Sequence, residues 1–240
     1  MADIKRLAEW MSSSRYTTIF SGAGMSTESG LPDFRSAGGL WKQNRRFEEL
    51  ASISALTHDF PEFVEFYRWR IRMLQGVEPH AGHRRIAEWQ REGRVHALIT
   101  QNVDGLHSRA GSPEAIELHG SLRRIRCQRC GAEADSERFL SDEGTHCECC
   151  GGKMRPGVVL FGEVLPEDAL RKAQEASERS ELFIALGSSL QVSPANYFPQ
   201  IAKSKGARLV ILNQGPTALD ALADLRLDGV IGEILERLPR

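Results

Sequence analysis

Apolar and polar positions alternate along the chain with two different periods, which predicts strands and helices in turn. Short apolar runs with the length of buried strands lie at 16–20, 95–100, 181–187 and 207–213. Apolar residues recur at helical spacing near the N-terminus, at Ile4, Leu7, Ala8 and Met11, and again over 81–92, 166–179 and 232–238. Strands that alternate with helices predict an α/β fold, in which helices cover both faces of a parallel sheet.

Two segments interrupt this alternation. Residues 36–80 are rich in aromatic side chains and mostly helical in pattern, whereas residues 120–156 are polar and contain all five cysteines. We therefore predict a large domain formed by residues 1–35, 81–119 and 157–240. The two interrupting segments are expected to form a smaller lobe, with 36–80 as its helical module and 120–156 as its cysteine-bearing module.

The overall composition is that of an ordinary globular protein. The 240 residues are 41% hydrophobic and 26% charged, with a formal net charge of −1. A nearly neutral chain has no general attraction to nucleic acid or to an anionic membrane. No apolar run approaches the ~18 residues of a membrane span, and the N-terminal MADIKRLAEWMSSS lacks the apolar core of a signal peptide. The expected location is therefore cytoplasmic, without a membrane partner.

The cysteines form a pattern typical of a zinc site. Two C-x-x-C pairs, CQRC at 127–130 and CECC at 147–150, are separated by 16 residues. Each pair supplies two thiolates to one tetrahedral ion, so the predicted ligands are Cys127, Cys130, Cys147 and Cys150. A register with Cys149 as a ligand would leave one residue, instead of two, within the second pair. Four thiolates leave no open position for water, so the predicted zinc is structural.

A cluster of arginines leaves a second class of function open. The cluster consists of Arg123, Arg124, Arg126 and Arg129. A zinc ribbon beside such a cluster also suits a nucleic-acid-binding module. The other interpretation is a solvated charged face, and the neutral chain without aromatic residues between the arginines favours it. Nucleic acid is therefore not an expected partner.

A glycine-containing loop follows the first predicted strand. In GAGMSTESGLPDFR, residues 22–35, Gly22 and Gly24 permit a sharp turn and close backbone approach. A helix is expected to follow, and its amide groups would attract a pyrophosphate. The dinucleotide fingerprint requires a third glycine at position 27, where this chain has Thr27, and no phosphate-loop lysine follows. Taken alone, the loop is equally consistent with a plain strand-to-helix turn.

Polar loops at the ends of the other predicted strands favour a ligand site. TQNVDG, GSS and NQG end the runs at 95–100, 181–187 and 207–213. Ligands of open parallel sheets bind at the carboxyl ends of the strands. These loops are therefore expected to converge on one crevice.

Seven motifs in this order resemble the sirtuin family: GAGMSTESGLPDFRSAGGLW, TQNVDGLH, ELHG, the paired C-x-x-C knuckles, GVVLFGE, GSSLQVSPA and LNQG. The resemblance covers almost the whole chain. It implies a Rossmann-like large domain, a smaller lobe of zinc ribbon plus helical module, and a cleft between them. It also implies an NAD-dependent protein lysine deacylase, whose partners are acylated lysine side chains of proteins. Because the missing third glycine is a trait of this family, it counts against a hydride-transferring dehydrogenase.

The resemblance also implies which residues contact NAD. The phosphates would lie beside Gly22, Ala23, Gly24 and Thr27. Asp33, Phe34 and Arg35 resemble the mobile cofactor loop, and Trp41 is similar to a further cofactor contact. Gln101, Asn102 and Asp104 resemble the pocket for nicotinamide and its ribose. The adenosine end would be held by Gly187, Ser188, Ser189, Asn213, Gln214 and Gly215.

The implied catalytic residues are His119 and Asn102. His119 ends the ELH stretch and is similar to the general base of the family, because an imidazole with a pKa near neutral can accept a proton from a ribose hydroxyl. Without its flanking motif, His119 would indicate a structural histidine. In the implied reaction, the acyl oxygen attacks C1′ of the nicotinamide ribose and expels nicotinamide, and water then releases O-acyl-ADP-ribose and free lysine. Protein mono-ADP-ribosyl transfer, which uses the same cleavage of NAD, remains an alternative.

The acylated peptide is expected to lie extended between GVVLFGE and LQVSPA, where it would pair with the backbone as an added strand. The implied peptide contacts are Val159, Phe161, Gly162, Glu163 and Val192.

A final motif concerns the acyl group. EFYRWR resembles the helix of class III sirtuins, in which a Y-x-x-R pair binds the distal carboxylate of succinyl or malonyl lysine. Tyr67 and Arg70 form this pair and, being three positions apart, share a helical face. Ala37 is similar to the small residue that leaves the pocket roomy. The alternative is that Tyr67 packs with Phe63 in the core while Arg70 points to water.

Overall fold

The computed structural model describes residues 2–238 and contains a six-stranded sheet in which neighbouring strands are parallel. The strands are β1 (Thr17–Ser21), β2 (Ala97–Thr100), β3 (Ile116–Glu117), β7 (Leu182–Leu186), β8 (Arg208–Leu212) and β9 (Leu225–Leu227). Their order across the sheet is β3-β2-β1-β7-β8-β9. This is the Rossmann order, so the predicted fold class is confirmed.

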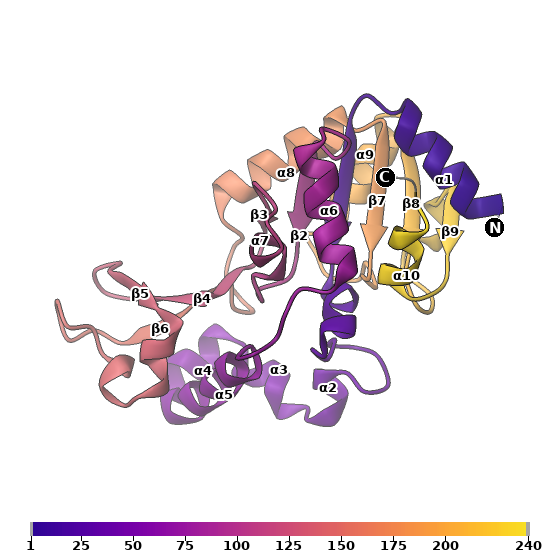
Figure 1. Ribbon diagram of the computed structural model, residues 1–240. Helices are drawn as coiled ribbons and strands as arrows, with labels where there is room; N and C mark the ends of the chain where they lie inside the picture. The colour runs from indigo at the N-terminus through magenta and orange to yellow at the C-terminus, as the bar shows by residue number, and fades with distance from the viewer. Residues whose placement is uncertain (1, 239–240) are drawn as a thin grey trace.

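Helices cover both faces of this sheet (Figure 1). One face packs on α1 (Ala2–Ser13), α6 (Ala81–Arg91) and α10 (Ile231–Glu236), and the other packs on α8 (Glu167–Arg179) and α9 (Tyr197–Ser204). The alternation of side chains along a strand supplies both cores, since Ile19 joins the first cluster and Phe20 the second. Both residues are fully buried.

Some elements differ from those that the pattern predicts. The glycine loop after β1 leads into a 3-10 helix, η1 (Ala23–Ser29), and not into an α-helix. The two-residue β3, the three-residue β9, the four-residue α7 (Leu106–Arg109) and helix α9 were not predicted. Strands of two or three residues are too short to produce a detectable alternation.

The smaller lobe lies below the sheet in Figure 1. It contains α2 (Leu40–Gln43), α3 (Arg46–Leu50), α4 (Ile53–His58), α5 (Phe60–Met73), η2 (Ser136–Leu140), η3 (Glu143–Thr145) and the antiparallel strands β4 (Gly120–Cys127), β5 (Glu133–Asp135) and β6 (Met154–Val158). One hydrophobic cluster joins α5 to β4 and β6. Arg68 of α5 also donates from Nε to the Phe139 carbonyl at 3.0 Å. The helical and cysteine-bearing segments therefore share a core.

The last short element, η4 (Asp220–Leu222), precedes β9 in the large sheet. Between residues 2 and 238, no helix combines the length and the apolar character that crossing a membrane requires.

Candidate active site

A cleft of about 650 Å³ lies where the loops after the parallel strands face the smaller lobe. Most of the predicted NAD contacts line it: Gly22, Ala23, Gly24, Asp33, Phe34, Arg35, Trp41, Gln101, Asn102, Gly187, Ser188, Ser189, Asn213 and Gln214. The predicted general base, His119, lines the same cleft. Convergence of the strand-end loops on one crevice is therefore confirmed by the structure.

Glycines allow the loops after β1 and β7 to touch backbone to backbone. The Gly24 amide donates to the Gly187 carbonyl at 2.8 Å. A Cβ at Gly24 would lie 2.8 Å from the Gly187 Cα, and a Cβ at Gly22 would lie 2.8 Å from the Gly187 oxygen. Only glycine fits such an approach. At this point the cleft is therefore lined by the backbone of the two loops.

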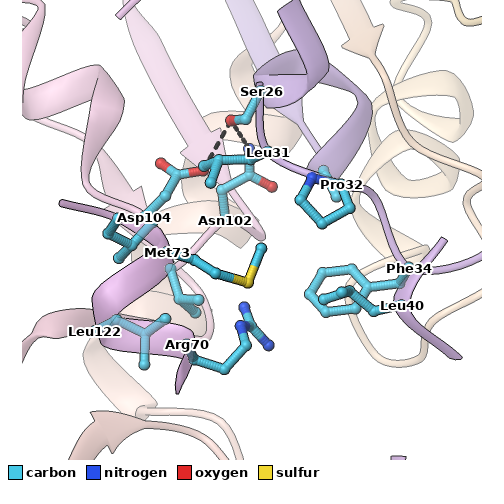
Figure 2. A pocket seen from close by; sticks show the side chains of 13 residues that line it. Ser26, Leu31, Pro32, Phe34, Leu40, Arg70, Met73, Asn102, Asp104 and Leu122 are labelled. Atoms are coloured by element: carbon cyan, nitrogen blue, oxygen red, sulfur yellow. Dashed lines mark hydrogen bonds between the residues drawn. The ribbon is translucent and has the colours of Figure 1, made fainter. Parts of the chain in front are cut away.

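A hydrogen-bonded group connects the loops after β1 and β2. Asn102 is buried and donates from Nδ2 to the Gly22 carbonyl at 3.0 Å and to Ser26 Oγ at 3.2 Å. Ser26 in turn donates to Asp104 Oδ2 at 2.7 Å (Figure 2). These side chains line a second, smaller pocket that adjoins the cleft. Asp104 lies in this pocket, and burial raises its pKa above the ordinary value.

The position of His119 determines which ring nitrogen faces a substrate. Its Nδ1 lies 2.9 Å from the Gln101 carbonyl oxygen, which can only accept, so Nδ1 carries the proton. In the neutral ring, Nε2 is then the free acceptor. Burial lowers the pKa of His119, although the bond to Gln101 opposes this effect. The arrangement provides a neutral base at ordinary pH.

Tyr67 and Arg70 of α5 also line the cleft. Tyr67 packs on Phe63, with ring centroids 4.6 Å apart, as the alternative interpretation expects. Arg70, however, is half-buried, and its guanidinium lies 5.3 Å from the ring centroid of Phe34. In Figure 2 it points between Met73 and Phe34. Among residues 2–238, Arg70 forms no salt bridge, although the buried Asp104 carboxylate shares the smaller pocket and attracts its charge.

The ionisation of this pair suits the recognition of an anion. Burial raises the pKa of Tyr67 to about 12, so its hydroxyl stays neutral and can donate. Burial lowers the pKa of Arg70, but a guanidinium remains protonated at ordinary pH. A positive charge without an ion-pair partner therefore faces the cleft beside a hydroxyl donor.

Three predicted contacts lie elsewhere. Thr27 is outside the cleft because its hydroxyl turns back to the Gly24 carbonyl at 2.9 Å. Gly215 is also outside, where its carbonyl accepts from Asn213 Nδ2 at 3.1 Å. Ala37 lies on an exposed turn and does not reach the cavity beside Arg70. Ala51 is a small residue that lines the cleft and belongs to the same hydrophobic cluster as Tyr67.

The predicted peptide contacts all line the cleft. They are Val159, Phe161, Gly162, Glu163 and Val192. The Val159 amide donates to the His119 carbonyl at 2.9 Å, and the Phe161 amide donates to the Ala51 carbonyl at 2.9 Å. This segment therefore connects the candidate base to the helical module.

The four predicted metal ligands form one cluster. The Sγ atoms of Cys127, Cys130, Cys147 and Cys150 all lie within 4.8 Å of one another. The Cys127–Cys150 and Cys130–Cys147 distances are 3.5 and 3.6 Å. The edges of a tetrahedron with Zn–S bonds of about 2.3 Å measure about 3.8 Å, so the set fits zinc. Cys149 is exposed and outside the cluster.

Two members of the arginine cluster, Arg124 and Arg126, have acidic partners. Arg124 lies 3.2 Å from Asp135 and 3.5 Å from Glu133, and Arg126 lies 3.8 Å from Glu163. Arg129 donates to the Cys150 carbonyl at 3.1 Å. These contacts favour the interpretation of a solvated, locally paired face.

Comparison with known proteins agrees with this geometry. The model of the Sir2 family matches residues 22–194, which include the glycine loop, His119 and the four clustered cysteines. The chain belongs to the Sir2 family. Its relatives include NAD-dependent protein deacetylase 1 of Geobacillus kaustophilus, 56% identical over 97% of this chain and 96% of the relative. NAD-dependent protein deacylase 2 of Pyrobaculum aerophilum is 44% identical over 97% and 93%.

Solved structures of the Sir2 family have the same fold. A Sir2 homologue in complex with NAD superposes with a TM-score of 0.91 at 40% identity, covering 98% of this chain and 91% of the homologue. A Sir2 variant with a deacetylated p53 peptide and 3'-O-acetyl ADP ribose gives a TM-score of 0.90 at 37% identity, covering 98% and 96%.

Ser26 and Ala51 are examples of site residues of this Sir2 chain that the sequence-based predictions omit. Ser26 lies two residues after Gly24 in the GAGMS motif, and this position was a usable signal. Ala51 has no motif around it, and only the packing of α3 and α4 against the cleft reveals it.

The cysteine cluster gives a matched pair of variants. Cys147→Ser should remove a metal ligand, abolish stoichiometric zinc and lower the melting temperature, because metal binding is coupled to folding of such ribbons. Cys149→Ser is the control and should retain zinc and stability, since its sulfur is outside the cluster. Elemental analysis and thermal unfolding measure both. Equal zinc loss in the two variants would contradict the assignment.

Proposed function

We propose that this Sir2 chain removes acyl groups from protein lysines with NAD as co-substrate, and that nicotinamide and O-acyl-ADP-ribose are the products. One observation carries the proposal: His119 lines the cleft on which the strand-end loops converge, and its Nδ1 bond to the Gln101 carbonyl leaves Nε2 as the free acceptor. A base placed there is suited to accept a proton from a ribose hydroxyl. The names of the relatives support the same activity.

The surrounding residues have distinct roles in this proposal. The phosphates of NAD lie against the loops after β1 and β7, which line the cleft and whose close packing Gly22, Gly24 and Gly187 permit. Asn102 orients the nicotinamide ribose, because its Nδ2 is already held by Gly22 and Ser26 and its Oδ1 remains available. Phe34, whose ring centroid lies 4.8 Å from that of Trp41, shields the reacting carbon from water. The cysteine cluster holds zinc and keeps the ribbon folded.

We further propose that the acyl groups include succinyl and malonyl as well as acetyl. The support is the charge of Arg70, which faces the cleft without an ion-pair partner in the described chain, beside the neutral hydroxyl of Tyr67. A terminal carboxylate would accept hydrogen bonds from both groups. Ala51 is a small residue of the same cleft and of the hydrophobic cluster that contains Tyr67, whereas Ala37 does not line the cleft.

A single incubation tests the proposed function. An acetyl peptide and a succinyl peptide are each mixed with NAD and the zinc-loaded protein, and the products are followed by mass spectrometry. Loss of the acyl mass with an equal amount of nicotinamide is expected. A peptide that gains the mass of ADP-ribose would favour protein mono-ADP-ribosyl transfer, and growth of NADH absorbance would favour a dehydrogenase. Intact NAD in every mixture would overturn the proposal.

The pH dependence of the reaction tests the base. The neutral form of His119 is the active form, so kcat/KM should fall as pH decreases through the pKa of this residue. Because burial lowers that pKa, the acid limb should have an apparent pKa below the ordinary histidine value of about 6.5. Initial rates between about pH 5 and pH 9 at constant ionic strength measure it. An acid limb centred above the ordinary value would contradict a buried, neutral base.

A further inference from the structure

Exposed apolar side chains gather on one edge of the cleft. Ile53, Phe161 and Val164 are 38%, 43% and 91% exposed, and we call these three residues the apolar lip. Among the described residues, only two other large hydrophobic side chains are comparably exposed, Tyr197 and Leu222. Single exposed apolar residues need no explanation, but a group beside a binding cleft indicates an interaction surface.

The apolar lip joins the helical module of the small lobe to the segment that follows β6. The Ile53 amide, at the start of α4, donates to the Phe161 carbonyl at 3.1 Å. A Cβ at Gly162 would lie 3.4 Å from Ile53 Cδ1, so the turn after Phe161 packs directly on the Ile53 side chain. Val164 is two residues beyond Gly162. Gly162 has φ +94°, a conformation that side chains rarely adopt, and this allows the tight turn.

An ion pair holds this turn in place. The Arg155 side chain is only 3% exposed, and its Nη1 lies 2.6 Å from Glu163 Oε1. Nη2 donates to Glu163 Oε2 at 2.9 Å, and the same oxygen accepts from the Leu160 amide at 2.8 Å. Burial raises the pKa of Glu163, but these hydrogen bonds outweigh it and hold the pKa below the ordinary value. The exposed Val164 therefore follows directly on a residue, Glu163, that this ion pair and these hydrogen bonds hold in place.

The apolar lip is continuous with the cleft. The Phe161 ring is 6.2 Å from Trp41, and Trp41 is 4.8 Å from Phe34, so a row of aromatic rings leads inward from the lip. Phe161 and Trp41 also line the cleft that contains Tyr67 and Arg70. A peptide whose modified lysine enters this cleft must carry a flanking residue across the lip.

We propose that the apolar lip binds an apolar side chain next to the acylated lysine, and that this chain acts on protein segments with such a neighbour. The inference rests on the proposed function and adds a sequence preference to it. Burial of a valine or leucine side chain against Val164 and Ile53 supplies the favourable free energy. A charged neighbour gains less there, because the three lip side chains are apolar and the adjacent Glu163 carboxylate is already paired with Arg155.

The test uses the full chain with acetyl-lysine peptides that carry Leu, Asp or Lys on either side of the modified lysine. Each kcat/KM is divided by that for an acetyl-lysine amide without flanking residues, so a general loss of active enzyme cancels. We expect the wild type to prefer Leu to Asp by about tenfold at one flank, as a partly buried side chain would give. Val164→Asp should reduce that preference to about twofold and should raise the relative rate with Lys.

Leu222→Asp is the matched control, since Leu222 is 40% exposed and lies outside the cleft. It should leave the preference unchanged. Equal rates with all flanks, or an unchanged preference in Val164→Asp, would overturn the proposal while leaving the deacylase intact. A dimer that Val164→Asp converts to monomer, with no change in preference, would overturn it in favour of a second copy on the lip. Failure to convert any peptide would instead contradict the proposed function.

Discussion

Replacement of His119 by alanine is expected to reduce acyl removal by about 10²–10⁴-fold, the usual contribution of a positioned general base. The loss should appear in kcat more than in the KM for NAD. The His119 ring supplies a proton acceptor, whereas the proposed phosphate contacts come from the backbone of the glycine loops. Steady-state release of nicotinamide and of deacylated peptide measures the effect. The two products should decline together.

The structure supplies controls for this variant. His58 is exposed on α4, far from the strand ends, so His58→Ala should retain wild-type rates. His119→Ala should still be stabilised by NAD in thermal unfolding, because the Gly22, Gly24 and Gly187 backbone is unchanged. If His119→Ala kept more than about a tenth of the activity, the base would have to be another group and the proposed mechanism would be wrong.

The large sheet could be predicted because its central strands are buried on both faces. Every residue of β1 and β7 is buried, as is all of β8 except Arg208, and each run is followed by polar loop residues that mark its carboxyl end. Burial on both faces is a property of a central parallel strand and leaves a continuous apolar run. The edge strands β3 and β9 lack such runs, since an edge needs only two or three residues to complete the ladder.

The candidate site was predictable to the extent that its chemistry is local in sequence. Cys127 and Cys130 are brought together by one turn, and Gly131, with φ +74°, makes that turn without strain. Ala51 could not be predicted in the same way. It reaches the cleft because its carbonyl accepts from Phe161, 110 positions further along the chain, and such pairings depend on tertiary packing.

Two further backbone hydrogen bonds join the small lobe to the large sheet around the cleft. The Leu122 amide donates to the Val103 carbonyl at 2.8 Å, and the Val159 amide donates to the His119 carbonyl at 2.9 Å. These backbone bonds fix the ribbon to the loops after β2 and β3. A change in the small lobe is therefore expected to alter substrate binding through positions of backbone atoms near His119, even where no side chain touches the substrate.

Arg70→Met is expected to lower kcat/KM for a succinyl peptide by about 10²–10³-fold, because two hydrogen bonds between a guanidinium and a carboxylate are lost in a partly buried pocket. For an acetyl peptide the same variant should equal or exceed the wild type. The acetyl group presents no anion to Arg70. Burial already disfavours the charged form of the Arg70 guanidinium, as its lowered pKa indicates. The quantity to measure is the ratio of the two kcat/KM values, in which losses of folded enzyme cancel.

Arg72→Met is the matched control on the same helix, since Arg72 is exposed and does not line the cleft. It should leave the succinyl-to-acetyl ratio unchanged. Tyr67→Phe, which removes only the hydroxyl donor, should lower the ratio by about tenfold, the value of one hydrogen bond to a charged group. A ratio that survives Arg70→Met would mean that Arg70 only packs on Phe34, and the cleft would then have to select acyl groups by size alone.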